Sequence, residues 1–163
     1  MAAGASTRSA ATVLTRSTPV GLHIPAIGVR TKLTRVGSGA DGTVHLPHTP
    51  DIAGWFDGGP APGEAGSAVL LGHRDSHRGP GVFFHLHRLR PGDILEIARA
   101  DGTAARFMVH GVATYPTSAF PADLVYGPHG GSSLQLVSCG GVNRHSHHND
   151  SHVVVYAGFA GTA

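Results

Sequence analysis

The stretch Leu-Gln-Leu-Val-Ser-Cys-Gly-Gly, at residues 134–141, contains the only cysteine of the chain, Cys139. Alternating leucines followed by a β-branched valine predict a β-strand, and the glycine pair predicts its end. We therefore expect the thiol at the end of a strand, beside a loop that leaves room for a substrate. Two interpretations stay open here, because a lone cysteine near a strand is more often a small core residue than a nucleophile.

A second apolar run, Ala-Val-Leu-Leu at residues 68–71, is followed by Gly-His-Arg-Asp at 72–75. His73 is therefore predicted at the exit of another strand. A cysteine and a histidine at the ends of different strands can form a pair in which the imidazole accepts the thiol proton. The alternative is a loop histidine that hydrogen-bonds Asp75, and the local sequence leaves both interpretations open.

The length and composition favour one mainly β domain. A chain of 163 residues suits a single core, and its 24 glycines and 11 prolines stand in clusters between short apolar runs. That arrangement is typical of short strands joined by tight turns, and no long segment has helical periodicity. We predict about eight strands and one or two short helices that close into a barrel. Residues 1–17, with little to bury, are predicted as a flexible leader, and residues 18–163 as the folded domain.

Individual elements follow from alternation and from turn residues. Trp55 and Phe56, within the irregular stretch 51–66, are expected to anchor a short helical turn to the core. Apolar residues at helical spacing predict a short helix or 3₁₀ segment over 82–89. Strands are predicted over 19–36 with a break at Pro25, over 43–46 after a turn at 41–42, and over 67–72, 94–98, 105–114, 133–138 and 152–157.

The charge and hydropathy patterns exclude several classes of protein. The formal net charge is only +2, with no basic stripe, so nucleic acid is not an expected partner. No run of 18 apolar residues is present, so we expect no membrane span. The first twelve residues lack the apolar region of a signal peptide.

A histidine-rich stretch near the end of the chain raises the question of a metal. Imidazoles at His145, His147, His148 and His152 suit zinc or nickel, but their spacing is crowded and no carboxylate pattern supports an ordered site. Calcium needs several carboxylates or carbonyls, and the ten acidic residues do not cluster. We therefore expect a solvated loop, with no metal site and no cofactor.

Two of these motifs carry a resemblance to a known family. Leu-Gly-His-Arg-Asp at 71–75 and Leu-Val-Ser-Cys-Gly-Gly at 136–141 resemble the sortases, the cysteine transpeptidases of Gram-positive cell surfaces, and most of all the class F sortases of actinobacteria. The supporting stretches are each weak, but their order and spacing are specific. They lie at 24–28, 55–63, 79–83, 89–93 and 153–156, so the resemblance covers roughly residues 19–158.

The resemblance implies an eight-stranded sortase-type β-barrel in which Cys139 is the nucleophile and His73 its acid/base partner. It implies cleavage of an LPxTG-like sorting signal between Thr and Gly through a thioacyl intermediate. The acyl group would pass to an amine of the cell-wall precursor or a pilin lysine, with slow hydrolysis as a side reaction. It further implies a monomer on the extracellular face of the membrane, anchored by an N-terminal segment not present in this sequence. Ser138 stands where the family usually has threonine.

The third functional residue of the family is an arginine after the cysteine, near the start of the last strand. Arg144 is the first choice for this role, although its loop lacks the Phe-Asp and Tyr-x-Asp-Asn features of class F. His152 is the alternative, because it directly precedes the valine run, where related classes carry arginine. Arg74 ranks third, since it can simply pair with Asp75. The competing hypothesis for the whole chain is a sortase-like barrel with an inert, buried Cys139 that acts as a binding or scaffold module.

Overall fold

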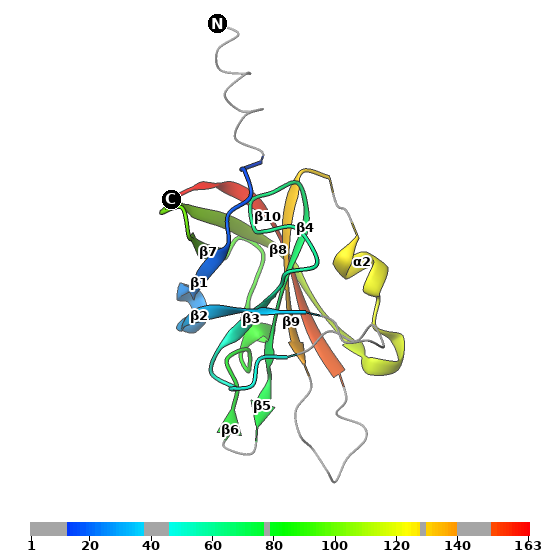
Figure 1. The fold of residues 1–163 in the computed structure, drawn as a ribbon. Coiled ribbons are helices and arrows are strands. Elements are labelled where there is room, and N and C mark those ends of the chain that lie inside the picture. The colour runs from blue at the N-terminus through cyan, green and yellow to red at the C-terminus, as the bar shows by residue number, and fades with distance from the viewer. Residues whose placement is uncertain (1–12, 38–45, 77–78, 128–129, 140–150) are drawn as a thin grey trace, which may run out of the picture.

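Eight strands close into a single barrel (Figure 1). The structure is a computed structural model that describes residues 13–37, 46–76, 79–127, 130–139 and 151–163. The order around the barrel is β1-β2-β3-β4-β9-β10-β8-β7. The strands are β1 (Pro19–Ile24), β2 (Val29–Val36), β3 (Ala53–Phe56), β4 (Gly66–His73), β7 (Ile94–Arg99), β8 (Ala104–Pro116), β9 (Ser132–Cys139) and β10 (Ser151–Thr162). The predicted mainly β, eight-stranded barrel is confirmed.

Short elements connect these strands. They are the 3₁₀ turns η1 (Pro25–Ile27), η2 (Leu86–Arg88) and η3 (Thr117–Ala119), the helix α2 (Ala122–Tyr126), and a small hairpin of β5 (Asp75–Ser76) and β6 (Gly79–Pro80). Proline at the start of η1 breaks the first predicted strand, and Gly28, with φ of 69°, reverses the chain into β2. The predicted turn at 41–42 and most of the strand predicted over 43–46 lie outside the described residues.

One expectation was wrong. Trp55 and Phe56 do not form a helical turn; they belong to β3, where alternation sends Trp55 into the core at 1% exposure. The barrel is mixed, because β2 pairs with β3 and β4 pairs with β9 in parallel, while the other neighbouring strands are antiparallel. Parallel pairing needs a long crossover connection, and the segments between these strands provide it.

Alternation along β4 and β9 separates two clusters of apolar side chains. Leu70 and Leu136 point into the barrel interior, together with Trp55 and Phe107. Val69, Leu71 and Val137 point to the outer face instead. There they form the outer cluster, which also contains Val36, Val125 and Val154 with the partly buried Leu46, Phe56, Tyr115, Phe120, Tyr126, Cys139 and Tyr156.

The helix α2 lies beside the barrel (Figure 1) and contributes Val125 and Tyr126 to this outer cluster. Val125 of α2 is fully buried, and its carbonyl accepts a hydrogen bond of 2.7 Å from the side-chain amide of Gln135 in β9. A buried amide that finds such a partner avoids the cost of an unsatisfied polar group. Gln135 therefore fixes the helix beside the strand that ends in Cys139.

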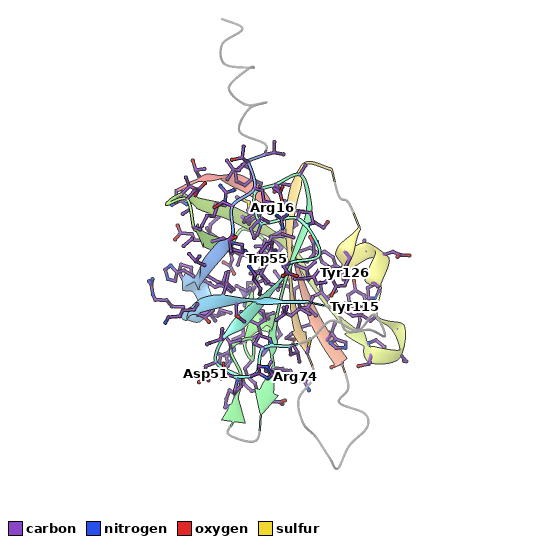
Figure 2. All side chains as sticks on the ribbon, in the orientation of Figure 1. Arg16, Asp51, Trp55, Arg74, Tyr115 and Tyr126 are labelled. Carbon is purple, nitrogen blue, oxygen red and sulfur yellow. The ribbon has the colours of Figure 1, made fainter. Side chains whose placement is uncertain are left out.

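Residues 13–17 run along the opposite end of the barrel. The backbone N–H of Leu14 donates to the carbonyl of Gly63, and Arg16 pairs with Glu64 at 2.9 Å. The Arg16 guanidinium also lies 5.3 Å from the ring centre of Trp55 (Figure 2). In the described part of the chain, no helix has the length and apolar character needed to cross a membrane.

Candidate active site

His73 and Cys139 lie directly opposite each other on neighbouring parallel strands. The register between β4 and β9 runs from Gly66 opposite Ser132 to His73 opposite Cys139. One residue further, the backbone N–H of Arg74 donates to the carbonyl of Cys139 at 3.0 Å. The structure thus brings together the two side chains that sequence patterns singled out, at the lower end of the barrel in Figure 1.

The thiol of Cys139 sits at the edge of the outer cluster. Burial raises the pKa of Cys139 to about 12, so the thiol is protonated near neutral pH. Among the described residues, no group hydrogen-bonds the sulfur. Burial, and then the charge that Cys139 would carry as a thiolate, raise the pKa of neighbouring Tyr126 to about 12 as well. Burial therefore favours the neutral thiol over the thiolate in the resting site.

The imidazole of His73 has a different partner from the one its local sequence offered. Its Nε2 lies 2.8 Å from the carbonyl oxygen of Pro47, 26 positions away in the chain. Asp75 instead lies 3.8 Å from Nε of Arg74. The hypothesis of a loop histidine bound to Asp75 is therefore wrong.

Arg74 links the ends of two strands on either side of β9. Its Nη1 donates to Oγ of Ser151, the first residue of β10, at 3.2 Å. Figure 2 shows Arg74 at the same lower end of the barrel where β9 stops. The predicted pairing with Asp75 is present, but the contact with Ser151 is the shorter one. Sequence reasoning missed that contact, because the two residues are 77 positions apart.

The structure describes only one of the two leading candidates for the third residue. Arg144 lies outside the described residues, as do His145, His147 and His148. His152 is the second residue of β10 and pairs with Tyr115 of β8. The next residue of β10, Val153, pairs with Ser138, which directly precedes Cys139. His152 therefore belongs to the same strand end as the thiol.

Side chains from the connection between β8 and β9 hold the ring of His152. Its Nε2 lies 3.2 Å from Oγ1 of Thr117, and Phe120 approaches the ring edge-on with 5.1 Å between ring centres. Both partners come from the connection between β8 and β9. This connection and the start of β10 thus form one wall of the site.

Aromatic side chains continue that wall. The hydroxyls of Tyr115 and Tyr156 are hydrogen-bonded at 3.0 Å, and Phe56 packs edge-on against Tyr126 with ring centres 5.4 Å apart. Tyr115 and Tyr126 lie on the same side of the barrel in Figure 2. The sequence left substrate-binding residues unknown, and the aromatic–proline pairs at 115–116 and 120–121 are the one signal that could have indicated them.

A hollow of about 450 Å³ lies beside the segment that contacts His73. Pro47, whose carbonyl holds the His73 ring, lines this hollow. Its remaining lining comes from β2 and from the segment before β3, namely Thr34, Arg35, Val36, Gly37, Leu46, His48, Thr49 and Ile52. Val36 and Leu46 also belong to the outer cluster, so the hollow adjoins that cluster.

Within the described ranges, no group of three or more histidine, cysteine, aspartate or glutamate side chains could hold a metal ion. His152, the one described member of the histidine-rich stretch, contacts Thr117 and Phe120. The chemistry available in the described site is therefore that of a thiol, imidazoles and an arginine.

Comparisons with known proteins agree with this fold. A family model described as the sortase domain matches residues 22–160. The comparison with curated proteins finds no match. Among solved structures, SrtA sortase from Actinomyces oris is similar with a TM-score of 0.64 and 22% identity, over 92% of this chain and 84% of that one.

Two other solved structures show the same barrel. Sortase A from Corynebacterium diphtheriae matches with a TM-score of 0.64 and 16% identity, over 90% of this chain, which spans 62% of that chain. Sortase C of Streptococcus pneumoniae matches with a TM-score of 0.64 and 20% identity, over 89% of this chain and 68% of that one. At such identities the likeness shows the fold, and the chemistry has to be argued from the site.

Proposed function

Since the chain belongs to the sortase family, we propose that it is a cysteine transpeptidase in which Cys139 is the nucleophile and His73 the acid/base group. One observation carries the proposal. The parallel register of β4 and β9 puts these two residues opposite each other at the strand ends, on the face that carries the outer cluster. A nucleophile within reach of an imidazole base is the minimum that acyl transfer through a thioester requires.

The first half of the reaction moves one proton and one acyl group. Sγ of Cys139 bonds to the scissile carbonyl carbon, the π electrons move to the carbonyl oxygen, and the thiol proton passes to His73. His73 then gives this proton to the leaving amine nitrogen as the C–N bond breaks, leaving a thioacyl enzyme. A thiol pKa raised to about 12 supports proton transfer during attack, because a preformed thiolate would be rare near pH 7.

The second half reverses these roles. An incoming amine gives a proton to His73 and bonds to the thioester carbon, and Cys139 leaves with that proton as a thiol. Water in place of the amine gives hydrolysis.

The negative oxygen of each tetrahedral intermediate needs a donor. We propose that it comes from the β9–β10 connection or the start of β10, and Arg144 and His152 are the two candidates. The position of His152, one residue before the Val153–Ser138 pair, supports the second of them. Arg74 acts instead as a strand-end clamp in this proposal, because its guanidinium contacts Ser151.

The finer assignments come from the resemblance of motifs. We propose an LPxTG-like signal cut between Thr and Gly, an amine acceptor of the cell wall, class F membership and an origin in an actinobacterium. The aromatic wall supports the apolar Leu-Pro part of such a signal, since rings supply large apolar contact area. A monomer on the extracellular face of the membrane, anchored by a preceding segment, belongs to the same proposal.

The test is cleavage of a quenched LPxTG-type peptide with and without a glycine or amine acceptor. We expect acceptor-dependent product from the parent chain and none from Cys139→Ala or His73→Ala. The exposed His87→Ala serves as a histidine control and should keep full activity. Comparing Arg144→Ala with His152→Ala identifies the oxyanion donor, and substantial turnover in either Cys139→Ala or His73→Ala would contradict the Cys–His mechanism.

A second candidate function rests on the same thiol. The raised pKa of Cys139, and the absence of a hydrogen bond to its sulfur from the described residues, are also what an inert cysteine in a binding or scaffold barrel would have. Trapping with a sorting peptide that carries an electrophile separates the two hypotheses. A covalent adduct on Cys139 supports the transpeptidase, whereas binding of the peptide without any adduct supports the scaffold.

A further inference from the structure

We propose that the backbone carbonyl of Pro47 is a positioning group for His73, which holds Nε2–H and leaves Nδ1 to exchange the proton with Cys139. This inference rests on the proposed function, because it assigns atoms to the acid/base role of His73. It adds a third component to the pair, a main-chain oxygen from the segment that precedes β3.

The hydrogen bond itself determines which ring nitrogen carries the proton. Nε2 of His73 lies 2.8 Å from the Pro47 oxygen, and a carbonyl can only accept. Nε2 must therefore be the donor, and in the neutral ring Nδ1 has the free lone pair. A bond of this kind on one nitrogen selects the nitrogen that remains for chemistry, as it does for many functional histidines.

Backbone hydrogen bonds from residues 82–83 connect both to His73 and to the segment that contains Pro47. The backbone N–H of Val82 donates to the carbonyl of Pro50 at 2.8 Å, which holds the turn that begins at Pro47. The next N–H, that of Phe83, donates to the carbonyl of His73 at 3.0 Å. Residues 82–83 thus tie the segment that contains Pro47 and Pro50 to the backbone of His73.

Two glycines allow the close approach. A Cβ at Gly81 would lie 2.3 Å from the carbonyl oxygen of His73, so any side chain there would displace the backbone of His73. A Cβ at Gly54 would lie 3.0 Å from Cγ of the buried Pro47. The packing therefore keeps the carbonyl in a fixed place, which is what a positioning group requires.

The proton route follows from this arrangement. The thiol proton moves to Nδ1 as the S–C bond forms, and both ring nitrogens then carry hydrogen. The Pro47 oxygen accepts from Nε2–H throughout and takes no proton. Its hydrogen bond is strengthened while the ring is charged, because a charged donor binds an acceptor more strongly. The same Nδ1–H is the proton that passes to the leaving amine.

The direct test is NMR of the full chain with ¹⁵N-labelled histidine, with the His73 ring assigned from the signals missing in His73→Gln. We expect a slowly exchanging ring N–H on Nε2 of His73. An N–H on Nδ1, or a ring N–H that exchanges as fast as that of an exposed histidine, would overturn the proposal. This readout needs no activity, so it stands even if His73→Ala keeps turnover and the proposed function fails.

A backbone substitution makes the test specific to the carbonyl. Replacing residue 48 by its α-hydroxy analogue converts the Pro47–His48 amide into an ester, whose carbonyl is a weaker acceptor. We expect the Nε2–H to exchange faster and kcat to fall about tenfold with KM little changed, since one hydrogen bond in the transition state is weakened.

Two controls separate this role from simple packing. The same ester one bond later, between His48 and Thr49, should leave both the ring N–H and kcat at parent values. Pro47→Ala keeps the carbonyl and removes the ring, so it should retain the Nε2–H signal. An unchanged signal and unchanged kcat in the first ester, or loss of the signal only in Pro47→Ala, would show that the carbonyl has no positioning role.

Discussion

The two ends of the β4–β9 pair have the same register and the same outward face, but the polar side chains at the two ends differ in their hydrogen-bond partners. At one end, Oγ of Ser67 and Oγ of Ser133 lie 3.0 Å apart, and Ser67 also donates to the carbonyl of Gly127. At the other end, His73 and Cys139 are paired by register but share no hydrogen bond. The histidine is held from outside the pair, by Pro47.

This difference separates a stabilising pair from a reactive one. A hydroxyl pair that satisfies itself lowers the cost of burying polar atoms and leaves nothing for a ligand. A thiol next to an imidazole whose proton position is set elsewhere can transfer its proton when a substrate arrives. The same backbone geometry therefore serves stability at one end and chemistry at the other.

The largest effect is expected from a substitution at His73. His73→Gln keeps a side-chain N–H for the Pro47 carbonyl but has no basic nitrogen, so kcat/KM should fall roughly 10³-fold. The melting temperature should stay within about 3 °C of the parent value, because the hydrogen bond is retained. Peptide cleavage and circular dichroism measure the two effects. If the variant lost stability and activity together, His73 would be a structural residue like Ser67.

The pH dependence of alkylation at Cys139 tests whether the thiol is neutral. Since burial raises the pKa of Cys139 to about 12, the thiolate fraction in the free chain should grow about tenfold per pH unit between roughly pH 7 and pH 10. Iodoacetamide alkylation, followed by mass spectrometry, should therefore accelerate across this range without a plateau. A plateau near neutral pH would mean that a preformed ion pair, and not a neutral thiol, is the resting state.

The same pKa predicts a small effect on stability. Above about pH 9 an unfolded chain loses the Cys139 proton while the folded chain keeps it, so the unfolded state binds fewer protons and stability falls as pH rises toward about 12. Cys139→Ala should remove this part of the pH dependence. The measurement is the free energy of unfolding in urea at about pH 8 and pH 10. An equal change in this free energy between the two pH values for the parent and for Cys139→Ala would contradict the raised pKa.

At the stabilising end, Ser67→Ala should have the reverse profile. It leaves the Gly127 carbonyl without its hydroxyl donor, which should cost roughly 1–3 kcal/mol of unfolding free energy. Activity per folded molecule should change by less than about twofold, because no group of the proposed mechanism is altered. Urea unfolding and active-site titration give these values. A large loss of kcat in folded protein would show that the two ends are coupled.

The smallest expected effect concerns the clamp between strand ends. Ser151→Ala removes one acceptor of Arg74, a partly exposed contact whose loss should cost about 0.5–1.5 kcal/mol. Peptide cleavage should fall by less than about threefold if Arg74 only positions the strand ends. If Arg74→Ala lowered peptide cleavage several hundredfold, Arg74 would instead belong to the groups that act on the substrate.

Local sequence patterns determined much of this protein. Period-2 alternation and turn residues marked most of the strands, and they placed Cys139 and His73 at strand ends, because side-chain alternation is a property of the strand itself. Alternation also explains why Leu136 lies inside the barrel while Val137 lies in the outer cluster. The segment around Trp55 was misjudged, since its strand forms through pairing with β2 on one side and β4 on the other.

What the tertiary structure decided depends on residues far apart in the chain. The parallel pairing of β4 with β9 set His73 opposite Cys139, and the turn at 47–50 supplied the carbonyl that holds His73. Packing of the outer cluster raised the pKa of Cys139, which no local motif encodes. Register, long-range hydrogen bonds and burial arise only when distant segments meet, so a sequence can nominate the reactive residues while the fold sets their proton states and partners.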